Sequence, residues 1–487
     1  MLTVVLIVLP FVAALLALRL PQQLAGRVAF LAALAELIVS VVVLFHFDKT
    51  GGLQFVFDKH WIDSLGISFS VGIDGISLLL VLLTTVLTPG IILTAWGDTS
   101  KPSSYFSLIL AMQAALVGVF VAQDGFLFYL FWEMALIPIY FICLNWGGEN
   151  RGKITLKFFI YTLTGSLLML VALILLYVKT PGTHTFAIQA LYEAGRSMDL
   201  PHQTFVFATM FLAFAIKMPV FPFHTWQPDT YTVAPVQGTM LLSAIMLKMG
   251  IYGVIRWLIP MVPLAVKEWG MIAIILSVIG IVYASCIAWV QKDFKRLVAY
   301  SSIAHVGLIS AGTLTLNETG MQGAIIQMIS HGVIVFGMFY IVEIVSARTH
   351  TREMNQLGGI RNVAPILATA FSVIMLGSVA LPFTSGFVGE FLLINSLVHY
   401  QLWLGVVAGL TMILSVVYMF RAFQKTMLGE TNTLTASVGD LTRQERFVLY
   451  PIVILIVLIG IYPQPLLDIS ATAVKNLLSV YLDVRFL

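Results

Sequence analysis

Three charged residues lie in apolar segments of the chain, where a charge facing lipid would be unstable. Lys217 lies in AFAIKMPVFPF, Lys248 in MLLSAIMLKMGIYGV and Glu133 in FLFYLFWEMALIPIYFICLNW. A Lys or an acid at the centre of a membrane helix costs about 2.5–3.5 kcal/mol on insertion scales, so such residues face the interior of a helix bundle. There they commonly mark the path of an ion or a proton, and these three are therefore the first functional candidates.

A buried lysine suits proton transfer because its protonation depends on its surroundings. Burial disfavours the charged ammonium and a nearby carboxylate favours it. Unlike an arginine, a lysine can also give up its proton. Glu133 is the natural counter-charge of Lys217, so parting of the pair would change the proton affinity of the lysine. The alternative is a static ion pair that fixes helix packing, which explains Lys248 less well because no carboxylate stands near it in the sequence.

Two histidines and a further acid follow in the second half of the chain. His305 follows AYSSIA, and His331 lies in MQGAIIQMISHGVIVFG, one turn after Gln327 on the same helical face. Imidazole titrates near physiological pH and can relay a proton between its nitrogens. A single membrane histidine more often only packs helices, but two of them between a lysine and Glu390 favour a relay. Glu390 could cap the start of a half-helix, act as the terminal proton carrier, or do both.

The composition predicts a membrane protein. Of 487 residues, 59% are hydrophobic and 10% are charged, and the mean hydropathy is +0.98, too apolar for a soluble surface. The 26 Lys and Arg against 23 Asp and Glu leave a net charge of +3 without a basic run, which excludes a nucleic-acid binder. Cys143 and Cys286 stand far apart in apolar segments, and we expect small buried side chains there, with no disulfide.

No motif for a nucleotide, flavin, haem or iron–sulfur cluster stands in the chain. We find no Walker A loop, no GxGxxG after a strand, no HExxH and no CxxCH. We therefore predict that this chain has no catalytic redox centre, cofactor or metal, and that its energy source lies in partner subunits or in an ion gradient.

Apolar segments of about 17–25 residues can cross a bilayer as helices. The sequence predicts fourteen: 2–18, 27–46, 76–95, 106–123, 126–146, 157–178, 204–219, 235–257, 270–290, 297–315, 321–346, 364–382 continuing to 398, 402–424 and 447–466. Lys and Arg are about twice as frequent in the loops on the side of Arg19 and Arg27 as in the opposite loops. By the positive-inside rule, those loops are cytoplasmic and both termini lie outside.

Two of these regions do not fit simple helices. The stretch 219–235 carries four prolines, which interrupt the helical hydrogen-bond ladder. The stretch 364–398 would be about 50 Å long as one straight helix, and Pro382 and nearby glycines supply a break. Paired broken helices point to an inverted-repeat transporter.

We expect one membrane domain over 1–487, divided as follows: N-terminal helices 1–95, a first repeat 106–257, a second repeat 270–424, and a C-terminal helix and tail 447–487.

Other polar residues stand near the predicted helix ends. We expect four of them to be interfacial anchors on the cytoplasmic side: Asp293, Lys295, Arg296 and Glu343. The proline-rich interruption carries His224, Trp226 and Asp229, which could gate the entry of water or satisfy exposed backbone groups.

Six stretches together resemble the antiporter-like membrane subunits of respiratory complex I, NADH:quinone oxidoreductase. In chain order between Ser70 and Gln424 they are FWEMALIPIYF, FAIKMPVFPFHTWQPD, APVQGTMLLSAIMLKMGIYGVIR, QKDFKRLVAYSSIAHVG, SHGVIVFGMFY and GFVGEF. In that family the L-type and N-type subunits typically carry lysine at the position matched by Glu390. Glutamate there resembles the M-type subunit, which corresponds to mitochondrial subunit four.

The resemblance implies a proton path of six residues: Glu133, Lys217, Lys248, His305, His331 and Glu390. In that path Glu133 and Lys217 are the coupling pair and Lys248 holds the proton. His305 and His331 relay the proton, and Glu390 is the terminal site. The resemblance also implies fourteen helices with inverted five-helix repeats. The sequence does not distinguish a bacterial plasma membrane from an organelle membrane, and we expect the former. NADH, flavin, iron–sulfur clusters and quinone would be bound by other subunits.

The implied partners are the L-type, N-type and small membrane subunits of the complex. Because related subunits serve sodium/proton antiporter complexes, such a subunit is the alternative. A third reading is a passive scaffold with fixed ion pairs.

Overall fold

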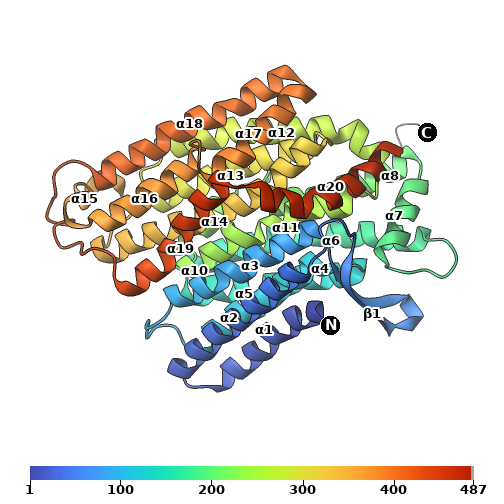
Figure 1. Ribbon diagram of the computed structural model, residues 1–487, viewed down its shortest axis with the longest axis horizontal. Coiled ribbons are helices and arrows are strands. Elements are labelled where there is room, and N and C mark those ends of the chain that lie inside the picture. The colour runs from blue at the N-terminus through green and yellow to red at the C-terminus, as the bar shows by residue number, and fades with distance from the viewer. Residues whose placement is uncertain (484–487) are drawn as a thin grey trace. The chain divides into compact units, whose positions relative to one another are not determined.

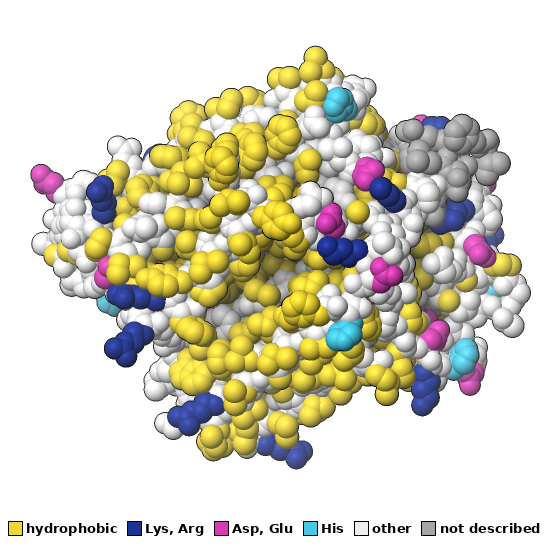
Figure 2. Space-filling model, viewed as in Figure 1, with side chains coloured by type: hydrophobic (Ala, Val, Ile, Leu, Met, Phe, Trp, Pro, Cys, Tyr) yellow, Lys and Arg dark blue, Asp and Glu magenta, His cyan; other side chains and the backbone are white. Residues whose placement is uncertain are grey.

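The computed structural model describes residues 1–483, and in them the chain is mostly α-helical (Figure 1). Long apolar segments become helices because a membrane offers no water to satisfy backbone polar groups. On the face drawn in Figure 2, hydrophobic side chains cover most of the surface. The predicted class, an all-α polytopic membrane protein, is confirmed.

Within the described residues, eleven helical stretches are long and apolar enough to cross a membrane. They are α1 (Leu2–Arg19), α2 (Gln22–His46), α3 (Gly75–Thr94), α4 (Ser103–Val121), α5 (Gly125–Trp146), α6 (Arg151–Lys179), the composite stretch Val236–Leu258, α12 (Pro263–Val290), α14 (Glu318–Thr349), α18 (Leu402–Met427) and α19 (Arg443–Ile461).

The predicted count of fourteen spans is not confirmed by this criterion. The remaining predicted spans correspond to helices that are shorter or more polar: α8 (Leu200–Lys217), α13 (Phe294–Thr313), α16 (Pro365–Ser378) and α17 (Ser385–Tyr400). The length and mean hydropathy of the helices in the structure therefore identify fewer membrane spans than the apolar segments of the sequence predict.

Three further elements were not predicted. A hairpin of β1 (Gln54–Ile62) and β2 (Ile67–Ile73) joins α2 to α3, and a short helix α7 (Ile188–Ser197) precedes α8. The helix α20 (Gln464–Asp483) follows α19 and is too polar to be recognised by hydropathy. It packs on the start of α3, where a Cβ on Gly75 would lie only 1.8 Å from the carbonyl oxygen of Ile469.

The described helices form two compact units, each built from separate stretches of the chain. The first contains residues 1–218, 245–273 and the C-terminal stretch from Asp468, and the second contains 219–244 and 274–467. These units are not the segments predicted as repeats, 106–257 and 270–424, and that division stays a prediction.

Both predicted helix interruptions are present. After α8 the chain is irregular until α9 (Gln227–Val233), and α16 is separated from α17 by residues 379–384. In the second break Ala380 and Phe383 adopt left-handed backbone conformations, with φ of 54° and 69°. Such conformations are unfavourable for residues with a Cβ, so surrounding contacts must hold this turn in place.

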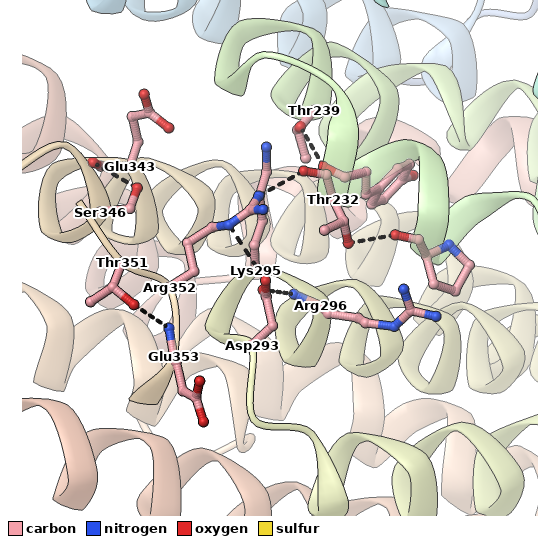
Figure 3. A network of polar contacts seen from close by, with 12 residues as sticks. Thr232, Thr239, Asp293, Lys295, Arg296, Glu343, Ser346, Thr351, Arg352 and Glu353 are labelled. Atoms are coloured by element: carbon pink, nitrogen blue, oxygen red, sulfur yellow. Dashed lines mark hydrogen bonds and ion pairs between the residues drawn. The ribbon is translucent and has the colours of Figure 1, made fainter. Parts of the chain in front are cut away.

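A polar network holds the first interruption (Figure 3). Lys295 donates to the carbonyl of Ala234 at 2.6 Å, and Arg352 donates to that of Thr232 at 2.8 Å. The last carbonyls of a helix have no partner within it, so these donors satisfy the end of α9. Lys295 is only 5% exposed. Its ammonium therefore binds the broken helix end and is not exposed as an anchoring side chain would be, while the interfacial position of this residue stays a prediction.

The other residues around this interruption lie as follows. Asp229 pairs with Arg296 at 3.2 Å, and His224 is buried with its ring 5.2 Å from that of Tyr283.

Cys143 is buried as expected, whereas Cys286 is exposed on α12. The expectation of a buried Cys286 is wrong because an apolar membrane helix also turns small side chains outward.

Candidate functional site

Lys217 is the last residue of α8, and its ammonium faces α5. Its side chain is only 2% exposed. The Nζ atom makes no hydrogen bond within the described part of the chain, and it lies 5.3 Å from the centre of the Trp132 ring. Glu133, the next residue on α5, interacts with it electrostatically, although Oε1 of Glu133 has no hydrogen-bond partner there either. The Glu–Lys pair is thus drawn together by charge without a hydrogen bond, and the aromatic face provides a second attraction for the cation.

Lys248 is fully buried at the start of α11 (Lys248–Gly253). This helix lies between two π-helical segments, Leu241–Met246 and Val254–Leu258. A π-helix is rare and often accompanies a functional site, because it redirects the side chains of the helix it interrupts. The chain therefore has an irregular backbone on both sides of this lysine.

The two lysines are positioned by close packing of α8 against α11. A Cβ on Gly250 would lie 2.9 Å from both the backbone nitrogen of Met218 and the carbonyl oxygen of Phe214. Only glycine permits backbones to approach this closely, as in other helix pairs in membranes. The position of Lys217 at the end of α8 therefore depends on the missing side chain at Gly250.

The second group of candidate residues centres on Glu390, which is 1% exposed on α17. Its Oε1 lies 2.7 Å from Nδ1 of His305 on α13 and accepts a hydrogen bond from Nε2 of Gln327 on α14 at 3.2 Å. Neither nitrogen of His305 makes a hydrogen bond of good geometry in the described residues. Nδ1 of His305 and Oε1 of Glu390 are therefore in close contact, but the contact does not have the geometry of a hydrogen bond.

His331 completes this group. Its ring centre lies 6.2 Å from that of His305. Between them is a cavity of about 10 Å³ that is also lined by Gln327 and Glu390. This volume is close to what one water molecule requires. The cavity that both imidazoles line therefore has room for about one water molecule.

The predicted capping role of Glu390 is wrong. The N-cap residue of α17 is Thr384, and no acid lies in the first turn of the helix. Because the helix begins directly after the break, at Ser385, the carboxylate is carried beyond the first turn and points to the histidines instead. The terminal-carrier role of Glu390 stays a prediction.

The six predicted residues thus fall into two groups. Glu133, Lys217 and Lys248 belong to the first unit, and the two histidines and Glu390 belong to the second. No group of three or more His, Cys, Asp or Glu side chains in residues 1–483 has the geometry to hold a metal ion. The chemistry available is proton exchange between ammonium, carboxylate and imidazole groups.

Sequence reasoning missed three features of these groups. Trp132 was not selected, although it directly precedes Glu133 in the sequence. Tyr418 on α18 was also missed, and its hydroxyl lies 3.1 Å from that of Ser301 beside the second group. The π-helical segments around Lys248 leave no signal in the sequence.

A family model described as NADH:quinone oxidoreductase/Mrp antiporter, transmembrane, matches residues 122–415. The chain belongs to this family. The match contains all six candidate residues, so both groups lie in the part of the chain that defines the family.

Three known proteins extend the comparison over nearly the whole chain. NADH-quinone oxidoreductase subunit M of Rickettsia typhi is 40% identical, covering 93% of this chain and 92% of that protein. A subunit of respiratory complex I from Thermus thermophilus, solved with bound NADH, is 29% identical with a TM-score of 0.90, covering 98% and 99% of the two chains. A chain of the Mrp complex from Dietzia, 20% identical with a TM-score of 0.89 and covering 99% and 98%, shares the fold. The predicted resemblance to M-type subunits is confirmed by the similarity to relatives of that name.

Proposed function

We propose that this chain is the proton-translocating M-type membrane subunit of an NADH:quinone oxidoreductase. The observation that carries the proposal is the state of Lys217, a buried lysine that makes no hydrogen bond within residues 1–483 and lies between the charge of Glu133 and the ring of Trp132. A buried ammonium held so weakly is sensitive to any movement of its carboxylate partner. Similarity to subunit M proteins supports the choice of complex.

Each residue then has a defined role. Movement of Glu133 away from Lys217 favours release of the lysine proton, and its return favours uptake. Lys248 stores a proton in the membrane, and His305 and His331 pass it on through the small cavity between them. Glu390 receives it as the terminal carrier, since its carboxylate oxygen already lies at 2.7 Å from His305.

The proposal places the redox chemistry elsewhere. This chain is a non-redox subunit, and NADH, flavin, iron–sulfur clusters and quinone are bound by its partners. Those partners include L-type, N-type and small membrane subunits. The complex lies in a bacterial plasma membrane with both termini of this chain on the periplasmic side, which is the orientation favoured by the distribution of Lys and Arg.

The test is proton transfer by the assembled complex in vesicles. Lys217→Ala and Glu133→Ala should leave the complex assembled, as judged by co-purification of its subunits, but severely lower proton transfer driven by NADH oxidation. The matched controls are exposed residues of the same types, Lys179→Ala and Glu149→Ala, which should transfer protons normally. Full pumping by an assembled Lys217→Ala complex would rule out the proposed role.

A subunit of a sodium/proton antiporter is the second candidate, because the Mrp chain shares the fold over its whole length. Measurements on vesicles that contain the purified complex distinguish these two candidate functions. Proton movement driven by a sodium gradient, without NADH or quinone, would favour the antiporter. Co-purification with subunits that oxidise NADH would favour the first proposal.

A further inference from the structure

Glu36 is an acid in the middle of a membrane helix, outside both groups described above. It lies on α2, ten residues before the end of the helix at His46, which is about 15 Å at 1.5 Å per residue. Its side chain is 0% exposed. Both carboxyl oxygens lack a hydrogen-bond partner in the described part of the chain.

The side chain of Glu36 faces the neighbouring helices and not the lipid. The buried residues near it on α2 recur every three or four positions: Ala29, Ala33, Glu36, Ser40 and Val43. This face packs against α1, α3 and α4. Since its side chain is enclosed near the centre of the span, Glu36 cannot extend its carboxyl group to the water at either end of the helix.

No charged group faces Glu36 from the helices that pack against it. The helices α3 and α4 contain no Asp, Glu, Lys, Arg or His, and the charged residue of α1 is Arg19 at its last position. On α2 itself, Arg27 is nine residues before Glu36 and His46 is ten residues after it, about 13 and 15 Å along the axis. An ionised carboxylate here would have no counter-charge from the described helices that pack against it.

The hydroxyl groups where α2 meets α3 already use their protons in other hydrogen bonds. Ser40 contacts Thr85 at 2.8 Å, which aligns α2 with α3 and puts Thr88 at the level of Glu36. Ser40 and Thr85 share one hydrogen bond between their hydroxyls, and each of these hydroxyls, like that of Thr88, also lies within hydrogen-bonding distance of a carbonyl of its own helix. Since a hydroxyl has a single proton to donate, these contacts leave none for a carboxylate at Glu36.

We propose that Glu36 is a proton-binding site of the N-terminal helices. Its ligand is a proton: one carboxylate oxygen binds H⁺ and becomes the O–H of a neutral carboxylic acid, and loss of that proton restores the carboxylate. The site shares no residue with the path between Glu133 and Glu390. It therefore adds a protonatable centre separate from both of those groups, whether or not the proposed path carries protons.

Infrared spectroscopy of the purified complex in lipid nanodiscs tests this site. The wild-type complex should show a carbonyl band of a protonated carboxylic acid at neutral pH that shifts in D₂O. This component should be lost in Glu36→Gln and kept in the control Glu149→Gln, which alters an exposed acid. An unchanged protonated-acid band in assembled Glu36→Gln would overturn the proposal.

Chemical labelling gives an independent readout. A lipophilic carbodiimide reacts with a protonated carboxyl group in a membrane and leaves a stable acylurea, which peptide mass spectrometry locates. Labelling should occur on the peptide that contains Glu36 and vanish in Glu36→Gln. Because glutamine imitates the neutral acid, this variant should assemble normally, and failure to assemble would show that the charge is needed and the proposal wrong. An unlabelled wild-type peptide would contradict it as well.

Discussion

Oε1 of Glu390 lies 2.7 Å from Nδ1 of His305, and the same oxygen accepts a hydrogen bond from Gln327. Three helices, α13, α14 and α17, therefore meet at one carboxylate oxygen. Gln327 restrains the carboxylate while the imidazole remains poorly aligned with it. Proton exchange across this contact requires the imidazole to come into line with the carboxylate, because a hydrogen bond weakens steeply when its donor is misaligned.

Replacing Glu390 by glutamine should separate this function from the structure. The amide keeps the shape of the side chain but cannot bind the proton. Positioned proton-transfer groups contribute about 10²–10⁴-fold to rates, so proton transfer by the assembled Glu390→Gln complex should fall at least about tenfold. The measurement is acidification of vesicles during NADH oxidation. Glu343→Gln changes a half-buried acid of α14 and should keep the wild-type rate. Equal rates in both variants would contradict the role of Glu390.

Lys217→Arg tests whether this lysine must lose its proton. The guanidinium keeps the positive charge beside Glu133 and Trp132, but it remains protonated in proteins. Proton transfer should therefore be lost, as in Lys217→Ala, while assembly is retained because a cation still faces the carboxylate. Lys179→Arg changes an exposed lysine and is the matched control. Normal pumping by Lys217→Arg would mean that only the charge of this residue matters.

The sequence predicts the helices and the candidate residues well, because both follow from the cost of polar groups in lipid. Apolar runs identify most spans, and a charge inside such a run identifies Lys217 and Lys248. The same rule applies to Glu36, which stands in LAALAELIVSVVV and is absent from the predicted set. The signal for Glu36 is therefore present in the sequence itself.

Other features depend on contacts between distant segments. The burial of Lys295 follows from the end of α9, which is far from it in sequence. The π-helical segments around Lys248 are fixed by packing of the surrounding helices, because no residue type specifies a π-helix locally. The cavity between His305 and His331 likewise forms only when α13 and α14 pack. The pairing of residues that are distant in sequence, and the local geometry around them, are therefore seen only in the structure.

Gly250→Ala should destabilise the protein through the contact between α8 and α11. The added Cβ would lie 2.9 Å from backbone atoms of Phe214 and Met218, which cannot rotate away. Overpacking of this kind costs about 1–3 kcal/mol, measured as a lower thermal unfolding midpoint of the purified complex. Gly270→Ala on α12 is the control, because a Cβ there would meet nothing within 4 Å. If the two variants unfold at the same temperature, the close approach does not matter for stability.

Asp440 lies in the loop before α19 and should give a pH-dependent contribution to stability. Partial burial acts to raise its pKa, but hydrogen bonds from the backbone of Ile366, Leu441 and Leu367 and the charge of Arg446 together lower the pKa below its ordinary value of 3.8. Two of these bonds, both at 3.0 Å, cap the first turn of α16. Because the folded-state pKa is depressed, the stabilisation is present above the ordinary pKa and is lost as pH falls through the folded-state value.

Asp440→Asn should therefore lower the free energy of unfolding at neutral pH by about 0.3–1 kcal/mol, the usual contribution of a negative charge at the N-terminus of a helix. The difference from wild type should shrink as pH falls below the ordinary pKa of Asp, because the wild-type carboxyl is then also neutral. Thermal unfolding measured across this pH range checks the sign. Glu149→Gln removes an exposed acid and should show no such pH-dependent difference. A difference that grows toward acid pH would contradict the assignment, because it would mean that the carboxylate destabilises the folded loop.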